Sequence, residues 1–119
     1  MSCAAFVSYT LAVRTAAHLA HLSSTSYSQH IALGEFYEGI IPLIDKFAEV
    51  YTGYEQEIPK YPRVTTLDYD DPLELIDDYL DLVRQEMKGD ARRSQALMNT
   101  LAEIEELADQ TAYKLKFLK

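Results

Sequence analysis

The sequence has 119 residues, of which 48% are hydrophobic and 25% are charged, which is the size and composition of one compact domain with its own core. Nineteen acidic residues against eleven basic ones give a formal charge of −8, and this disfavours direct nucleic-acid binding, because gripping phosphates needs clustered lysine and arginine. The single Cys3 cannot form a disulfide within the chain, and no apolar run reaches the ~18 residues that span a bilayer. We therefore expect one soluble, cytoplasmic domain covering residues 1–119, with no membrane contact.

Two helices are predicted in the first half of the chain. The first covers residues 3–22 and ends at a run of serines and threonine. The second covers residues 26–52, because Ser26 and Gln29 have the spacing of a capping box at its start. Gly53 follows directly and is a suitable residue to end a helix.

A long connection and two further helices are predicted in the second half. Residues 53–72 hold three of the four prolines and form the connection. The third helix covers residues 72–88, with a proline in its first turn, and the fourth covers residues 91–118. The remaining proline, Pro42, falls inside the second helix, where we expect it to kink the axis.

Apolar residues recur at intervals of three and four along the last three helices. The seam positions are Leu33, Tyr37, Ile40, Ile44, Phe47 and Tyr51 in the second helix, Leu73, Ile76, Leu80, Val83 and Met87 in the third, and Leu97, Leu101, Ile104, Ala108, Leu115 and Leu118 in the fourth. A stripe of this kind is typical of helices packed lengthwise against one another, and strand-like alternation does not occur. The sequence therefore predicts an all-α protein, an antiparallel four-helix bundle.

Two histidines fall close to the first turn between helices. His18 lies about one turn before it, on the apolar side of the first helix, and His30 lies one turn after it. In an antiparallel hairpin the two positions come level, so we expect their imidazoles to face each other as a pair of metal ligands would. For an inward histidine alone, a hydrogen-bonded core residue is the commoner alternative.

Two carboxylates lie further along the second helix. Asp45 and Glu49 are four residues apart and share one face, which is also the spacing of an ordinary solvated pair. His30 and Asp45 are separated by about 22 Å at 1.5 Å per residue, too far to share an ion within one chain. Two copies of the helix crossing antiparallel about a two-fold axis would bring His18 and His30 of one copy to Asp45 and Glu49 of the other, giving two equivalent sites.

The spacing of these four residues resembles that of the Dps proteins, the miniature ferritins that oxidise and store iron at an inter-subunit ferroxidase centre. The similar segments are Ala17-His18-Leu19, His30-Ile31-Ala32-Leu33-Gly34-Glu35-Phe36-Tyr37 and Ile44-Asp45-Lys46-Phe47-Ala48-Glu49. Residues 107–117 are similar to the last Dps helix, with Tyr113 where that family often has tryptophan. The sequence also resembles small Dps-like proteins encoded by bacteriophages, whose location would be the host cytoplasm.

The resemblance implies a ferritin-like bundle and an activity. His18 and His30 would be metal ligands and catalytic residues from one subunit, and Asp45 and Glu49 from its partner, with Glu49 as the bridging carboxylate. Fe(II) would be bound and oxidised by peroxide or O₂ in a homodimer that belongs to a hollow shell of twelve subunits. Two imidazoles and two carboxylates also suit manganese or zinc, so the residue types leave the metal open.

The sequence departs from the family at identifiable positions. The family usually has an acidic residue four positions after the second histidine, where this chain has Gly34, and one ligand fewer implies weaker iron binding or none. Pro42 falls close to where the two helices would cross. No lysine-rich tail is present, so the DNA binding of the family is not expected.

An acidic stretch supports a different class of function. Its seven acids, with no base among them, are Asp68, Asp70, Asp71, Glu74, Asp77, Asp78 and Asp81. They form either a solvated helix face, or a route that attracts cations to an iron site, or a strip that mimics phosphates and occupies a host protein. The alternative to the ferroxidase is therefore a phage-encoded acidic bundle that kept the fold, lost the iron chemistry and acts by binding a host protein.

Overall fold

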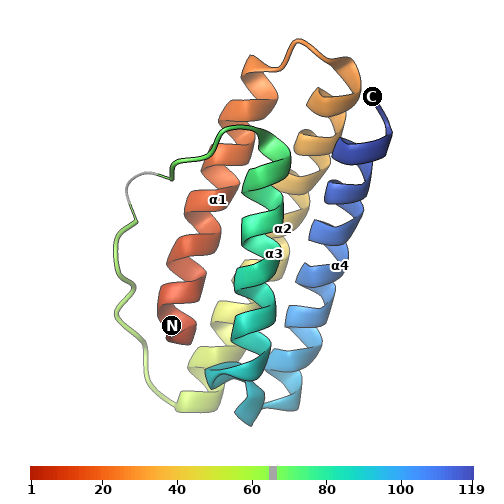
Figure 1. Ribbon diagram of the computed structural model, residues 1–119. Helices are drawn as coiled ribbons and strands as arrows, with labels where there is room; N and C mark the ends of the chain where they lie inside the picture. The colour runs from red at the N-terminus through yellow and green to blue at the C-terminus, as the bar shows by residue number, and fades with distance from the viewer. Residues whose placement is uncertain (65–66) are drawn as a thin grey trace.

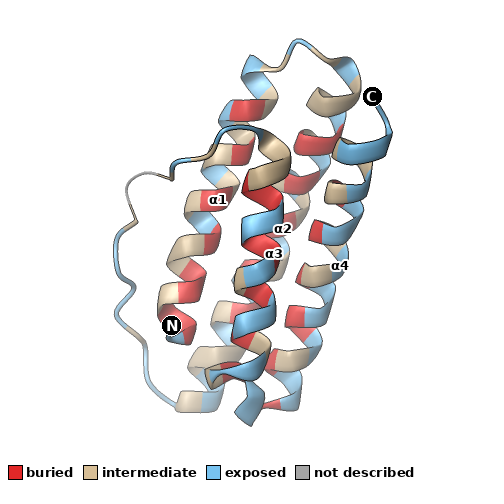
Figure 2. Cartoon of the chain, in the orientation of Figure 1, coloured by how far each residue is buried: buried red, intermediate tan, exposed pale blue. Residues whose placement is uncertain are grey.

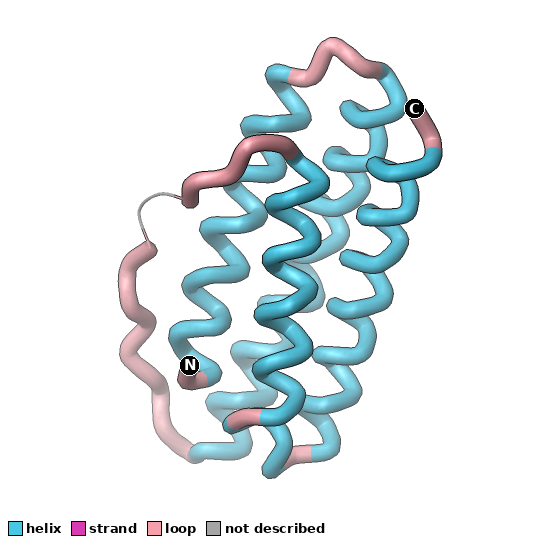
Figure 3. Tube along the Cα trace, in the orientation of Figure 1, coloured by secondary structure: helices cyan, strands magenta, loops and turns pink. Residues whose placement is uncertain are grey.

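The computed structural model describes residues 1–64 and 67–119, and all regular structure in those residues is helical (Figures 1 and 3). The elements are α1 (Cys3–Ser23), α2 (Tyr27–Glu55), α3 (Pro72–Lys88), a short 3₁₀ helix η1 (Asp90–Arg93) and α4 (Gln95–Phe117). The predicted all-α four-helix bundle is confirmed, and the bounds of its third helix agree with the prediction.

Each of the four α-helices begins at a capping side chain. The side-chain oxygens of Ser2, Ser26, Asp71 and Ser94 each accept a hydrogen bond from the backbone N–H three residues further on. Such a bond satisfies one of the donors that a helix leaves open at its first turn. The predicted cap at Ser26 is confirmed. The side chain of Gln29 does not return to it, however, but accepts from Ser24 Oγ (2.7 Å).

The end of α2 differs from the prediction that Gly53 would end it. The helix continues to Glu55, and the residue in the left-handed conformation is Gln56, with φ of 59°. Its backbone N–H donates to the Thr52 oxygen (2.9 Å), and its side-chain Nε2 donates to the Gly53 oxygen (2.6 Å). Gln56 thus satisfies two open carbonyls, one of them with a donor that glycine lacks. α2 also runs through Pro42 as one helix, and a kink there stays a prediction.

The start of α4 also differs, because the predicted fourth helix divides into two elements. Asp90–Arg93 form η1, and Ser94 then adopts an extended conformation with φ of −128° and ψ of 122°. The Ser94 hydroxyl accepts from the N–H of Leu97 (3.3 Å), so α4 begins at Gln95 rather than at residue 91. Ser94 is therefore both the residue that follows the end of η1 and the residue that caps the start of α4.

The helices form a rod of 45 × 26 × 20 Å with one long crossover. In Figure 1, α1 and α2 form a hairpin, residues 56–64 and 67–71 of the crossover lie along the bundle between the end of α2 and the start of α3, α3 runs in the direction of α2, and α4 returns. Both α1 and α4 pack against α2 and α3. Neighbouring helices are therefore antiparallel, while the two diagonal pairs are parallel. The crossover follows α1, where the Tyr69 hydroxyl donates to the Ala16 oxygen (3.3 Å).

The buried side chains form one core along the inner faces of all four helices (Figure 2). Most seam positions of the last three helices are buried, and Tyr37, Tyr51, Leu73, Met87 and Leu115 are half-buried at its edges. Leu118 is exposed because it lies beyond the end of α4, so its assignment to the seam is wrong. Within the described residues, none of the helices has the length and apolarity that crossing a membrane requires.

Candidate metal centre

Three histidine rings and a tyrosine ring gather where α1 and α2 meet near their hairpin. His21 and His30 stack with centroids 3.7 Å apart and 17° between their planes. His18 stacks on Tyr37 at 3.9 Å, and its ring lies 6.2 Å from that of His21. We call these four residues the ring cluster. The ring stacked on His30 is thus that of His21 and not, as the sequence predicted, that of His18, which stacks on Tyr37 instead.

The stacked histidines exchange hydrogen bonds with the opposite backbone. His30 Nδ1 donates to the carbonyl oxygen of His21 (2.8 Å), and His21 Nδ1 donates to that of His30 (2.5 Å). A carbonyl oxygen can only accept, so each Nδ1 carries the hydrogen. In the neutral ring the lone pair then lies on Nε2, and a histidine fixed through Nδ1 to a carbonyl is the usual form of a metal ligand.

The ring of His21 packs against Gly34, which has no side chain to occupy that space. A Cβ atom at this position would lie 3.0 Å from Cε1 and 3.2 Å from Nδ1 of His21, tighter than most real Cβ contacts, so the imidazole would have to shift by a few tenths of an ångström. The imidazole of His21, from the neighbouring helix, therefore occupies the space beside Gly34. The sequence does contain a signal for this, because His21 is three residues after His18 and one turn from the hairpin.

Asp45 and Glu49 are exposed on α2, towards the other end of the bundle from His30. At 1.5 Å per residue, Asp45 lies about 22 Å and Glu49 about 28 Å from His30 along the helix, so this part of the prediction depends on a second copy of the chain. Among the residues that the structure describes, no group of three histidine, cysteine or acidic side chains is arranged to hold an ion within one chain.

The acidic stretch divides into capping residues and an exposed face. Asp71 caps α3 through the N–H of Glu74 (3.0 Å), and Glu74 accepts from the N–H of Asp70 (3.1 Å). Asp77, Asp78 and Asp81 are exposed on α3, and none of them is among the ion pairs formed by the described residues. Part of this stretch therefore has a local structural role, and part faces solvent.

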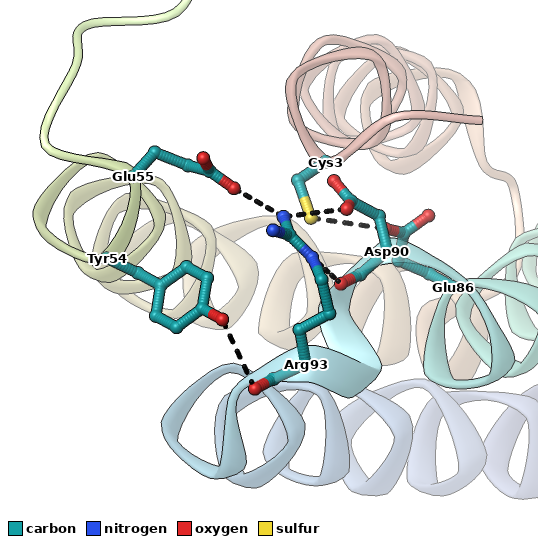
Figure 4. Close-up of polar contacts among 6 residues, drawn as sticks. All are labelled: Cys3, Tyr54, Glu55, Glu86, Asp90 and Arg93. Carbon is teal, nitrogen blue, oxygen red and sulfur yellow. Dashed lines mark hydrogen bonds and ion pairs between the residues drawn. The ribbon is translucent and has the colours of Figure 1, made fainter.

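A second polar cluster lies at the opposite end of the bundle, where α1, α2 and α3 meet η1 (Figure 4). The Cys3 thiol donates to Glu86 Oε1 (3.3 Å), and both residues are buried. Arg93 forms ion pairs with Asp90 (2.7 Å) and with Glu55. Burial and the neighbouring acids raise the pKa of the Cys3 thiol. Because the reactive form of cysteine is the thiolate, this thiol is a packing group and not a nucleophile.

A groove of about 450 Å³ lies between α1 and the crossover. Leu11 and Leu19 line it from α1, and Val64, Leu67 and Tyr69 line it from the crossover. Its lining contains no histidine and no carboxylate among the described residues, so it offers no ligand set for a metal ion.

Comparison with known proteins gives one family and one relative. The relative, from Enterobacteria phage T4, is named only as an uncharacterized 14.6 kDa protein in the mobD-ri intergenic region. It is 29% identical over 112 residues, which cover 92% of this chain and 84% of the relative. No solved structure matches this one. Residues 21–115 match the family described as a family of unknown function, DUF5856, and since they make up most of the chain, the protein belongs to that family.

Proposed function

We propose that the protein binds Fe(II) between two copies of the chain and oxidises it, as the Dps-type spacing of its ligands implies. Each of two equivalent sites would take His18 and His30 from one copy and Asp45 and Glu49 from the other. The proposal rests on residues that the sequence analysis selected, and the geometry described above supports it in three ways.

The observation that carries the proposal is the orientation of His30. Its Nδ1 is held by the His21 carbonyl oxygen, which leaves the Nε2 lone pair free for an ion. His18 is half-buried in the same ring cluster, so neither imidazole is fully buried in the core. The donor set of imidazole nitrogen and carboxylate oxygen fits a first-row divalent ion such as Fe(II).

The arrangement of the helices also supports the proposal. Ferritin-like bundles differ from simple up-and-down bundles by one long crossover, and this chain has a crossover between α2 and α3. The exposure of Asp45 and Glu49 supports it too, because carboxylates that complete a partner's site must lie on the surface of the separate chain.

The chemistry balances with peroxide as the oxidant. Each Fe(II) gives up one electron, so two of them reduce one hydrogen peroxide, with two protons, to two water molecules. Iron is the substrate in this reaction. The side chains hold two Fe(II) ions and replace water around them, and the carboxylates offset the charge that rises as Fe(II) becomes Fe(III).

Anaerobic titration with Fe(II), followed by peroxide, tests the proposal. We expect saturable binding at the two equivalent sites of the dimer, then fast oxidation, and loss of both in His30→Ala and in Asp45→Asn/Glu49→Gln. Asp77→Asn/Asp81→Asn is a matched control, because it removes an exposed carboxylate pair of the same spacing on α3. Wild-type protein that binds no iron, or variants that bind it equally well, would contradict the proposal.

A second candidate function is favoured by the exposed acids of α3 and by the phage relative. The protein would then be an acidic bundle that binds a host protein by presenting Asp77, Asp78 and Asp81 in place of phosphates. Pull-down from host cells should recover one defined partner with the wild type and lose it with Asp77→Asn/Asp78→Asn/Asp81→Asn. Equal recovery by both proteins would rule this candidate out.

A further inference from the structure

We infer that His21 is a positioning residue for the proposed metal centre, holding His30 in the one orientation that binds an ion, and that Gly34 is the position that admits it. This inference rests on the proposed function. It adds a residue that the ligand spacing does not contain. It also gives a reason for the glycine at a position where an acid would be expected.

Contacts on two sides of the His30 ring carry the inference. On its edge, Nδ1 donates to the His21 carbonyl oxygen at 2.8 Å. On its face, the His21 ring covers it at a centroid distance of 3.7 Å. The first contact fixes which nitrogen bears hydrogen, and the second keeps the ring from rotating about its side-chain bonds. Nε2 is then the nitrogen left to bind the ion.

His21 itself is placed as a support and not as a ligand. A metal ion lies in the plane of an imidazole, along its nitrogen lone pair, at about 2.0–2.1 Å. The two planes are only 17° from parallel and 3.7 Å apart, so an ion in the plane of His30 lies well outside the plane of His21. In the stacked pair, His30 is therefore placed to bind the ion, and His21 is placed to hold His30 in position.

Gly34 makes this position of the His21 ring possible. Its missing side chain leaves the space that His21 Cε1 and Nδ1 occupy, at 3.0 and 3.2 Å from where a Cβ would stand. A larger residue would require this imidazole to shift by a few tenths of an ångström and so would disturb its stacking on His30. Gly53 offers a matched comparison in the same helix, because a Cβ there meets nothing within 4 Å.

Zn(II) binding to ¹⁵N-histidine-labelled protein tests this inference, because Zn(II) is diamagnetic and takes the same donors. In the metal-free wild type, two-bond ¹H–¹⁵N spectra should show His30 fixed with hydrogen on Nδ1. Added Zn(II) should then shift the Nε2 resonances of His18 and His30 and leave that of His21 in place.

Three substitutions and one control variant distinguish a supporting role of His21 from a role as a metal ligand. His21→Ala keeps the backbone carbonyl that accepts from His30 Nδ1, but it removes the ring that covers His30 and should weaken Zn(II) binding by about 10- to 100-fold, the usual effect of removing a group that orients a ligand. His21→Phe keeps a flat ring on His30 and should restore most of the affinity. Gly34→Ala should weaken binding as His21→Ala does, while Gly53→Ala should not.

The outcomes distinguish this inference from the proposed function. Wild-type protein that binds neither Fe(II) nor Zn(II) overturns both. A wild type that binds, with His21→Ala binding Zn(II) equally well, overturns only the role of His21. If His21→Phe is as weak as His21→Ala and Zn(II) shifts the His21 Nε2 resonance, then His21 is a ligand and the positioning role is wrong.

Discussion

At the residue scale, the buried carboxyl of Glu86 makes the stability of the protein depend on pH. Its side chain is 3% exposed, and burial raises its pKa above the ordinary value. Between the pKa of the unfolded chain and the higher pKa of the folded one, the folded state holds more protons. The free energy of unfolding therefore falls as pH rises through that window.

Glu86→Gln keeps an acceptor oxygen for the Cys3 thiol and cannot ionise. We expect its Tm to equal that of the wild type near pH 4 and to exceed it near pH 8, because only the wild type loses stability as pH rises through that window. Thermal unfolding followed by circular dichroism at both pH values measures this. Glu106→Gln, at an exposed position on α4, is the control and should show no such difference. A gain of equal size at both pH values would contradict the argument.

The hydrogen bond between Thr10 and Tyr79 gives a second prediction at this scale. The two hydroxyl oxygens are 2.9 Å apart in the core, where both side chains are almost completely buried. Thr10→Val should destabilise the protein by about 1–3 kcal/mol, because it leaves the tyrosine hydroxyl buried without a partner. Urea unfolding measures the change. Thr10→Val/Tyr79→Phe removes both polar groups and should recover most of the loss, and a double variant weaker than the single one would argue against this explanation.

The ring cluster marks the limit of what the sequence could predict about the site. Helical spacing brings His18 and His30 close to the same level of the hairpin, but it does not say which ring turns towards which. That choice depends on the space above Gly34, which His21 fills, and on the carbonyl oxygens at the ends of both helices. Contacts of this kind join residues on different helices, so the period of one helix cannot reveal them. The roles proposed for Asp45 and Glu49 involve a second chain, which the helical period of one chain does not describe.

At the scale of the element, Gly53 tests where α2 ends. The helix continues through this residue, whose backbone is not in the left-handed region, and a Cβ there has open space. Gly53→Ala should therefore stabilise the protein by about 0.5–1 kcal/mol, the difference between the two residues inside a helix. Urea unfolding again measures it. If the helix ended at this glycine in the left-handed conformation, alanine would destabilise the protein instead.

The helices themselves were predictable because capping, periodicity and proline placement agree along the sequence. The third helix, with Pro72 in its first turn and Gly89 after its last, has the bounds expected of it. The errors occur at two helix ends. Gln56 ends α2 in place of a glycine, so a preference for glycine does not predict this end. Ser94 is a residue type that commonly caps helices, but the separate 3₁₀ turn before it moves the start of α4 to Gln95.

At the scale of the whole molecule, the crossover determines which faces are free. A short turn after α2 would have made α3 its antiparallel neighbour. The residues between Glu55 and Pro72 are enough to return along the bundle, so α2 and α3 instead become a parallel diagonal pair. The crossover covers one side of α1, and the exposed residues of α2, among them Asp45 and Glu49, stay open to a second copy.

Mixing two defective chains tests whether that second copy completes the site. His18→Ala/His30→Ala lacks the imidazoles, and Asp45→Asn/Glu49→Gln lacks the carboxylates, so neither should bind Fe(II) alone. In an equal mixture, random pairing makes about half the dimers mixed, and each mixed dimer regains one of its two sites by symmetry. Anaerobic titration of the mixture after subunit exchange should therefore recover about a quarter of the wild-type capacity. A site built within one chain could not be restored this way, and recovery of none in a mixture shown to exchange would exclude the shared site.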